Sequence, residues 1–427
     1  MPPVVPPLAL REPALPFSPG HFVDAALSRK WLQVAAASAL INTSYGTMSY
    51  SFSVLVTRSA AGGDLGTGGL AIAFGAGLLV SGIAAIGVGT IADLFGVRRL
   101  LAGGSVFGLL GLVLFSFCNE AWQAALVMTF VLGPAMAATF YEPIYVLMNR
   151  WFTPGERPRA YGVLTLLSGV SITIFTPLTQ YLVEAGGWRT AVRVLGIILV
   201  VVGLAVAAIL REPPGNAQPG TARLGFVREM WLGMRSGNVA FWSFSIAFFF
   251  AAAAQGGFQF HFIALLESRG FDKSRVAEVI ALTGLLSLPL RLLLPASAGR
   301  ISSVRLLAGC LLLVALAAWV GSTATEWWQV WVYVLIYGSV FGAVFPLRAL
   351  VTAERFSGEF FGRLIGVQAL FLAFARAIGP AAVGLGGESR EGYEIAFKIC
   401  ALVLVASCVA MVIVLGRAAP AEKANPH

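Results

Sequence analysis

Three charged side chains stand inside long apolar stretches of this sequence. Arg291 interrupts ALTGLLSLPLRLLLPASAG (281–299), Arg376 interrupts LFLAFARAIGP (370–380), and Glu142 lies in ATFYEPIYVLMNRWF (138–152). Guanidinium groups can hold a planar carboxylate by parallel hydrogen bonds, and a buried carboxylate can carry a proton or neutralise an arginine. We therefore expect Arg291 and Arg376 to bind an anion, although each could instead pair with backbone carbonyls or with Glu142. Both roles of Glu142 stay open.

Uncharged polar side chains accompany these charges within the apolar stretches. We predict that they line the same site, and the alternative is that each forms a hydrogen bond between helices, worth about 0.6 kcal/mol. Arg348 lies only ~9 Å from the end of its stretch, so we expect its long side chain to reach the membrane surface. The predicted polar site residues are Asn42, Tyr45, Tyr141, Gln255, Gln259 and Tyr337.

The elements that must position these residues are membrane-spanning helices. Of the 427 residues, 58% are hydrophobic and 11% are charged, whereas soluble proteins carry about 25% charged residues. Each long apolar run can cross ~30 Å of hydrocarbon as a helix, so we predict an all-α membrane protein. The twelve predicted spans are residues 31–56, 67–91, 98–118, 121–149, 160–184, 189–210, 238–264, 276–298, 304–323, 327–352, 363–386 and 394–416.

The Lys and Arg residues behind the net charge of +9 are distributed unevenly between the two sides of these spans. With a cytoplasmic N-terminus, the cytoplasmic side holds 18 Lys and Arg and the opposite side holds 8, which is the positive-inside pattern. We therefore expect a multi-pass protein of the cell (inner) membrane, with both termini cytoplasmic and no nucleic-acid partner. Residues 1–30 lack signal-peptide features, and we expect a disordered tail. The four cysteines lack metal-ligand spacing, so we expect no metal, cofactor or disulfide.

Two short matches indicate that the chain is a duplication. RLLAG occurs at 99–103 and at 305–309, and Arg159 and Arg363 are each followed three residues later by Gly-Val. The offsets, 206 and 204 residues, nearly agree. We predict two six-helix bundles in the same orientation, related by an axis along the membrane normal. The bundles cover residues 31–210 and 238–416, a cytoplasmic linker covers 211–237, and a cytoplasmic tail covers 417–427.

The loop between spans 2 and 3, GTIADLFGVRRLL (89–101), resembles the signature of the major facilitator superfamily. The resemblance implies that fold, and it implies that the loop latches the two bundles in one of their alternating states. Glycine permits a tight turn here, and the Asp can accept hydrogen bonds from the arginines or from a helix N-terminus. Alternatively, the Asp only caps the turn and the arginines only orient the protein. The matching residues are Gly89, Asp93, Gly96, Arg98 and Arg99.

Within the superfamily, YGTMSYSFSVLV (45–56) and PLRLLLPASAGR (289–300) resemble the monocarboxylate porters and the oxalate:formate antiporters. In these porters an arginine of span 8 holds the substrate carboxylate, and Arg291 falls on that position. Arg376 is the nearest match to the second cation of the oxalate exchangers. Ser287 and Val54 depart from the pattern, because many porters have Asp and animal members have Lys at these positions. The missing Lys makes Glu142 the alternative proton site.

The resemblance thus implies a secondary active transporter for a small organic anion, a mono- or dicarboxylate, coupled to protons or exchanging a counter-anion. The alternative is a major facilitator exporter of amphipathic or neutral compounds, in which Glu142 binds substrate and the arginines pair internally. We expect no enzyme, because the sequence shows no catalytic constellation. The expected partners are the substrate, protons or a counter-anion, and the lipid bilayer, and we expect a monomer.

Overall fold

The computed structural model describes residues 19–56, 61–211, 235, 237–356, 361–384 and 390–417, and its elements in these ranges are helices. The first group is α1 (Pro19–Tyr45), η1 (Gly46–Tyr50), α2 (Ser51–Leu55), α3 (Ala61–Leu65), α4 (Thr67–Phe95), α5 (Val97–Phe115), α6 (Ala121–Val127), η2 (Met128–Leu132), α7 (Gly133–Thr139), α8 (Tyr141–Trp151), α9 (Arg157–Gly169) and α10 (Ser171–Ile209). The second group is α12 (Val239–Ser268), α13 (Lys273–Ala296), η3 (Ser297–Gly299), α14 (Ser303–Thr323), α15 (Trp327–Arg355), α16 (Phe361–Gly384) and α17 (Arg390–Arg417).

Within the described ranges, nine helical segments are long and apolar enough to cross a membrane. One of them, Arg157–Ile209, contains two passes because the backbone leaves the helical conformation at Gly187, where φ is 75°. The chain turns back there: Ser171 Oγ donates to the Asn42 carbonyl, and Gln33 donates to the Ile209 carbonyl, so both ends of α10 lie along α1. With α1–α2 and the shorter apolar part of α13, this gives the twelve predicted spans.

The first helix corrects one prediction. Helix α1 begins at Pro19, so residues 19–30 are helical and not part of a disordered tail. Proline suits the first turn of a helix, because the N–H it lacks would have no partner there. Residues 1–18, residues 212–234 of the predicted linker, and the tail from 418 onward lie outside the described residues.

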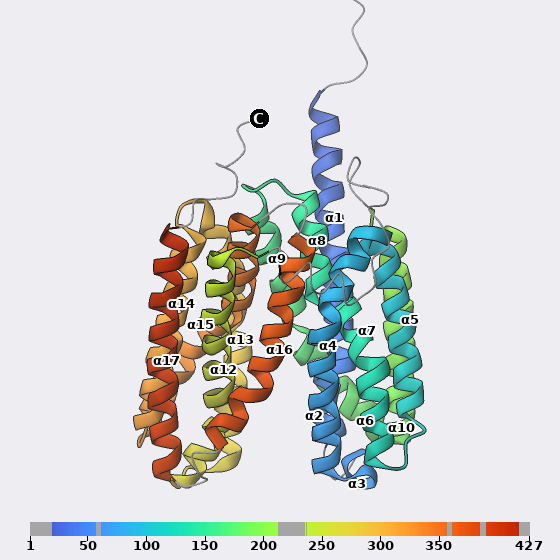
Figure 1. The fold of residues 1–427 in the computed structure, drawn as a ribbon. Helices are drawn as coiled ribbons and strands as arrows, with labels where there is room; N and C mark the ends of the chain where they lie inside the picture. Colours follow the sequence, from blue (N-terminus) through green and yellow to red (C-terminus); the bar gives the residue numbers. More distant parts are fainter. Residues whose placement is uncertain are drawn as a thin grey trace, which may run out of the picture.

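The two groups of helices stand side by side, and they meet where α4 packs on α16 and α9 packs on α13 (Figure 1). Small residues permit this close approach. A Cβ atom at Gly82 of α4 would lie 2.2 Å from the Cβ of Ala373, and one at Gly162 of α9 would lie 2.9 Å from the Leu292 carbonyl oxygen. Small residues thus set the close approach of the two groups at this interface.

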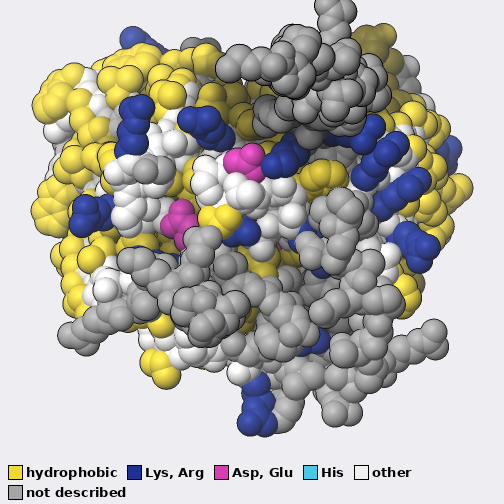
Figure 2. Space-filling model, turned by 90° about the horizontal axis from the view of Figure 1, so that it is seen from above, with side chains coloured by type: hydrophobic (Ala, Val, Ile, Leu, Met, Phe, Trp, Pro, Cys, Tyr) yellow, Lys and Arg dark blue, Asp and Glu magenta, His cyan; other side chains and the backbone are white. Residues whose placement is uncertain are grey.

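The start of α1 and the end of α17 lie at the same end of the molecule (Figure 1). Seen from above in Figure 2, this end carries many Lys and Arg side chains and few acidic ones. That distribution favours the predicted cytoplasmic side, and the orientation in the membrane stays a prediction.

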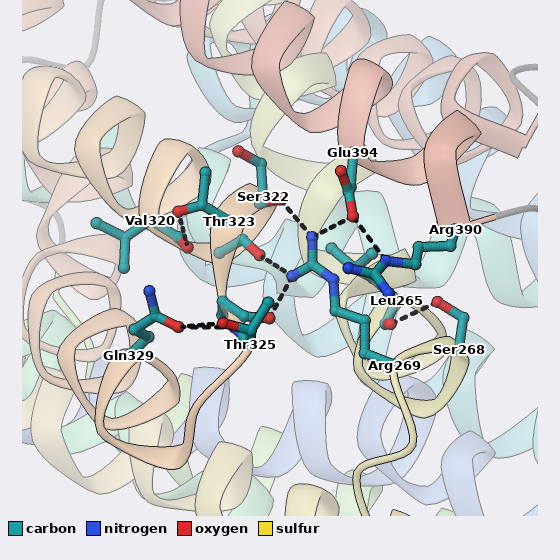
Figure 3. Close-up of polar contacts among 12 residues, drawn as sticks. Leu265, Ser268, Arg269, Val320, Ser322, Thr323, Thr325, Gln329, Arg390 and Glu394 are labelled. Carbon is teal, nitrogen blue, oxygen red and sulfur yellow. Dashed lines mark hydrogen bonds and ion pairs between the residues drawn. The ribbon is translucent and has the colours of Figure 1, made fainter.

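At the opposite end, an arginine of each group contacts an acidic residue and the end of a neighbouring helix. In the first group, Arg189 Nη1 donates to Asp64 Oδ2 at 2.7 Å, and Nη2 donates to the Cys118 carbonyl at 3.2 Å. In the second group, Arg269 Nη2 lies 2.8 Å from Glu394 Oε1. Arg269 also donates to three backbone carbonyls at the C-terminal end of α14, those of Gly321, Ser322 and Ala324 (Figure 3).

Candidate functional site

A cavity of about 290 Å³ lies between the two groups of helices. Most of the predicted binding residues line it, together with Glu142: these are Tyr45, Tyr141, Gln255, Gln259, Arg291 and Arg376. Two others do not. Asn42 donates its amide to the Leu167 carbonyl at 3.2 Å. Tyr337 is buried behind the wall, where its hydroxyl donates to Gln259 at 2.6 Å and accepts a longer hydrogen bond of 3.5 Å from Gln255.

Arg291 occupies a slot between helices of both groups. Asp272 caps the start of helix α13 by accepting a hydrogen bond from the Arg275 amide, and the helix carries Arg291 one turn after Ser287. Arg291 Nε donates to Ser287 Oγ at 3.1 Å. The room for the guanidinium comes from two glycines: a Cβ at Gly342 of α15 would lie 2.4 Å from Nε, and one at Gly169 of α9 would lie 2.9 Å from Nη1. Because the serine is uncharged, it orients the arginine without neutralising it.

Arg376 and Arg291 each lie over a phenylalanine ring of α15. The Cζ atom of Arg291 is 5.7 Å from the ring centre of Phe341, and that of Arg376 is 5.3 Å from the ring centre of Phe345. These phenylalanines are four residues apart on α15, so their rings lie on neighbouring turns separated by ~6 Å. Rings attract cations in such positions. Helix α15 therefore holds the two guanidinium groups at adjacent levels of the cavity.

A third arginine, Arg348, also lines the cavity. The prediction that its side chain reaches the membrane surface is wrong, because Arg348 is 2% exposed and its Nη1 donates to Gln368 at 3.0 Å. The amide of Gln368 is itself fixed, since Thr352 donates to it at 2.8 Å. Arg348 Nε is buried and has no hydrogen-bond partner. Helical spacing was the available signal, because Arg348 follows Phe341 and Phe345 by seven and three residues.

Glu142 lies in the first turn of α8, directly after a break in the predicted fourth span. The break is at Phe140, which is extended, and Pro143 explains it because proline lacks the N–H that would bond to the Thr139 carbonyl. A carboxylate in the first turn interacts favourably with the helix dipole. Among the described residues, no ion pair joins Glu142 to an arginine. The lining thus holds three guanidinium groups and one carboxyl group.

The predicted latch lies away from the cavity, at the turn between α4 and α5. Gly96 forms this turn with a φ of 85°, a conformation that glycine adopts without strain. Arg98 and Arg99 are exposed at the start of α5. The surroundings of Gly89 and of the Asp93 side chain lie outside what the structure describes, so the latch stays a prediction.

The family follows from a comparison with known sequences. The sequence model of the Major Facilitator Superfamily matches residues 32–380. This chain belongs to the Major Facilitator Superfamily. The fold agrees: the human organic anion transporter MFSD10 (TETRAN) superposes with a TM-score of 0.67 over 92% of this chain and 100% of its own, at 16% identity. That likeness shows the major facilitator fold alone.

Two curated relatives within the superfamily differ in what their names say they move. Monocarboxylate transporter 4 of Rattus norvegicus is 33% identical over 131 residues, which cover 29% of this chain and 27% of the relative. The Fujikurins efflux protein of Gibberella fujikuroi is 30% identical over 127 residues, which cover 30% of this chain and 26% of the relative. The chain thus matches only about a quarter of the length of these relatives.

Proposed function

We propose that this major facilitator protein moves a small organic anion, a mono- or dicarboxylate, across the membrane by alternating access. Arg291 and Arg376 bind the carboxylate in the cavity between the two groups of helices. The two groups rock about this site, and the loop with Gly89, Asp93, Gly96, Arg98 and Arg99 latches them in one state. The similarity to a monocarboxylate transporter supports this substrate class.

The observation that carries the proposal is the unequal charge of the cavity lining. Three arginines face one glutamate there, and no described ion pair joins Glu142 to any of them. An unpaired charge within a membrane costs at least about 2.5–3.5 kcal/mol. A bound carboxylate would offset this cost by forming charge-assisted hydrogen bonds with the guanidinium groups.

Transport by this site is coupled either to protons or to a counter-anion. In the first case Glu142 carries the proton, and in the second it neutralises one arginine when the cavity is empty. The protein works as a monomer in the cell (inner) membrane with cytoplasmic termini, because its cavity is complete within one chain and its cationic end follows the positive-inside pattern.

The test is uptake of radiolabelled mono- and dicarboxylates into proteoliposomes of the purified protein, with and without a pH gradient or internal anion. The proposal predicts uptake of at least one carboxylate over protein-free liposomes. With Glu142→Gln, loss of gradient-driven accumulation with retained exchange would assign the proton to Glu142. Absence of carboxylate flux under every gradient would contradict the proposal.

A second candidate is export of amphipathic or neutral compounds, which the similarity to the Fujikurins efflux protein favours. This function predicts that carboxylates leave the protein's thermal stability unchanged, whereas neutral amphipathic compounds raise it. A thermal-shift screen with both classes of compound therefore separates the two candidates, because a ligand stabilises the folded state that binds it.

A further inference from the structure

The cavity has two chemically different walls. All three arginines come from the second group of helices, on α13, α15 and α16. The first group faces them with a cluster of aromatic rings, which we call the aromatic wall. Its members are Tyr45, Tyr50, Phe140, Tyr141 and Tyr145, and all of them line the cavity.

The rings of the aromatic wall contact one another without a gap. Tyr45 stacks on Phe140, with ring centres 3.9 Å apart, and its ring centre lies 5.2 Å from that of Tyr141 and 6.1 Å from that of Tyr50. Tyr141 in turn stacks on Tyr145 at 5.6 Å. Because each ring is supported by the next, the wall presents a preformed surface to whatever enters the cavity.

The hydroxyl groups of Tyr45 and Tyr145 in this wall do not join neighbouring helices, whereas that of Tyr141 bonds to Ser168 of α9. Within the described structure, the hydroxyls of Tyr45 and Tyr145 form no hydrogen bond, whereas Tyr337 behind the opposite wall bonds to two glutamines. Neither the Tyr45 nor the Tyr145 oxygen is among the described buried polar atoms that lack a partner, and both tyrosines line the cavity, so these hydroxyls are open to a ligand there. A polar, ring-shaped ligand would supply a hydrogen-bond partner.

We infer that the transported anion carries an aromatic ring beside its carboxylate, an inference that rests on the proposed function. The carboxylate lies against the guanidinium groups, and its ring packs on the aromatic wall in an offset or edge-to-face arrangement. Each favourable ring contact of this kind raises affinity by about two- to tenfold beyond the area it buries. A volume of about 290 Å³ lies at the lower end of small-molecule pockets, which suits a single ring with one or two short acidic arms.

The test compares ligands that share size and charge but differ in the ring. Benzoate and cyclohexanecarboxylate are added as competitors of uptake, or as ligands in thermal shift, with acetate as a short carboxylate. The inference predicts that benzoate acts at a concentration at least about fivefold lower than cyclohexanecarboxylate. If the two act equally, or acetate acts best, the aromatic inference fails and the carboxylate function stands. If none of the three acts, and no other carboxylate does, the proposed function fails.

Substitutions in the aromatic wall test whether the preference for an aromatic ligand arises there. Tyr45→Leu should reduce the preference for benzoate over cyclohexanecarboxylate to near unity, whereas Tyr45→Phe should keep it because the ring remains. Tyr181→Leu is the matched control, since Tyr181 is 66% exposed on α10 and away from the cavity. If Tyr45→Leu fails to fold, Tyr50→Leu replaces it. A preference that survives loss of the ring at both positions would overturn the inference.

Discussion

Arg269 lies 2.8 Å from Glu394, and the same pairing recurs 205 residues earlier between Asp64 and Arg189 with the charges exchanged. The acid stands before the arginine in the first group of helices and after it in the second. In both groups the arginine also binds carbonyls near the end of a helix, α5 in the first and α14 in the second. The offset falls between the two found in the sequence, which favours the predicted duplication.

The two pairs differ in burial, and their contributions to stability should differ accordingly. The Arg269 side chain is 2% exposed, whereas that of Arg189 is 38% exposed. Removing one partner of a buried pair costs about 3–5 kcal/mol, and an exposed pair contributes about 1 kcal/mol or less. We predict that Arg269→Gln lowers the thermal unfolding midpoint in detergent far more than Arg189→Gln does. Arg29→Gln, at an exposed arginine of α1, is the control. Equal losses at both positions would contradict the prediction.

The stability contributed by Asp64 should depend on pH. Hydrogen bonds from Trp188 and Arg189 hold the pKa of Asp64 below its ordinary value. The resulting stabilisation is complete above the unfolded-state pKa of about 3.9 and is lost as the pH falls through the lower folded-state pKa. Because Asp64 is half-exposed, its contribution is about 1 kcal/mol or less. Asp64→Asn should therefore unfold at a lower temperature than the parent at pH 7, with the difference shrinking towards pH 3. A difference that stays constant over this range would exclude the mechanism.

The slot around Arg291 can be closed without removing a charge. Gly342→Ala would place a Cβ 2.4 Å from Arg291 Nε and 2.8 Å from the Cβ of Ser287, so the arginine must move. We predict a roughly tenfold or greater loss of carboxylate affinity, because small displacements of binding groups have effects of this size. Alanine favours the helix by up to about 1 kcal/mol over glycine, which opposes the cost of overpacking, about 1–3 kcal/mol, so the thermal unfolding midpoint is measured beside the affinity.

The control for this variant is Gly284→Ala on α13, where no atom lies within 4 Å of the new Cβ. Affinities are measured by competition of uptake in proteoliposomes. Unchanged affinity in Gly342→Ala would show that the position of Arg291 does not matter for binding.

The depth of the charged residues could be predicted from the sequence, and their rotation about each helix axis could not. Arg291, Arg376 and Glu142 line the cavity because a charge in a long apolar helix avoids lipid. Because Arg348 lies near the end of its span, the sequence predicts it at the membrane surface, but a hydrogen bond to Gln368 holds its side chain inside the protein. Asn42 and Tyr337 lie at suitable depths but face other helices. Tyr50, Phe140 and Tyr145 were missed because aromatic residues are frequent in spans. Only the packed structure distinguishes aromatic side chains that line the cavity from those buried between helices.

The central claim is that arginines in the cavity bind the anion, and carboxylate uptake by Arg291→Gln tests it most directly. Parent, Arg291→Gln and Arg29→Gln are reconstituted at equal density, and initial rates are measured over a range of carboxylate concentrations. We predict that Arg29→Gln matches the parent, whereas Arg291→Gln loses at least about tenfold in kcat/KM, since a hydrogen bond to a charged group contributes about 1.5–3 kcal/mol. Transport of every carboxylate by Arg291→Gln at the parent rate would contradict the claim.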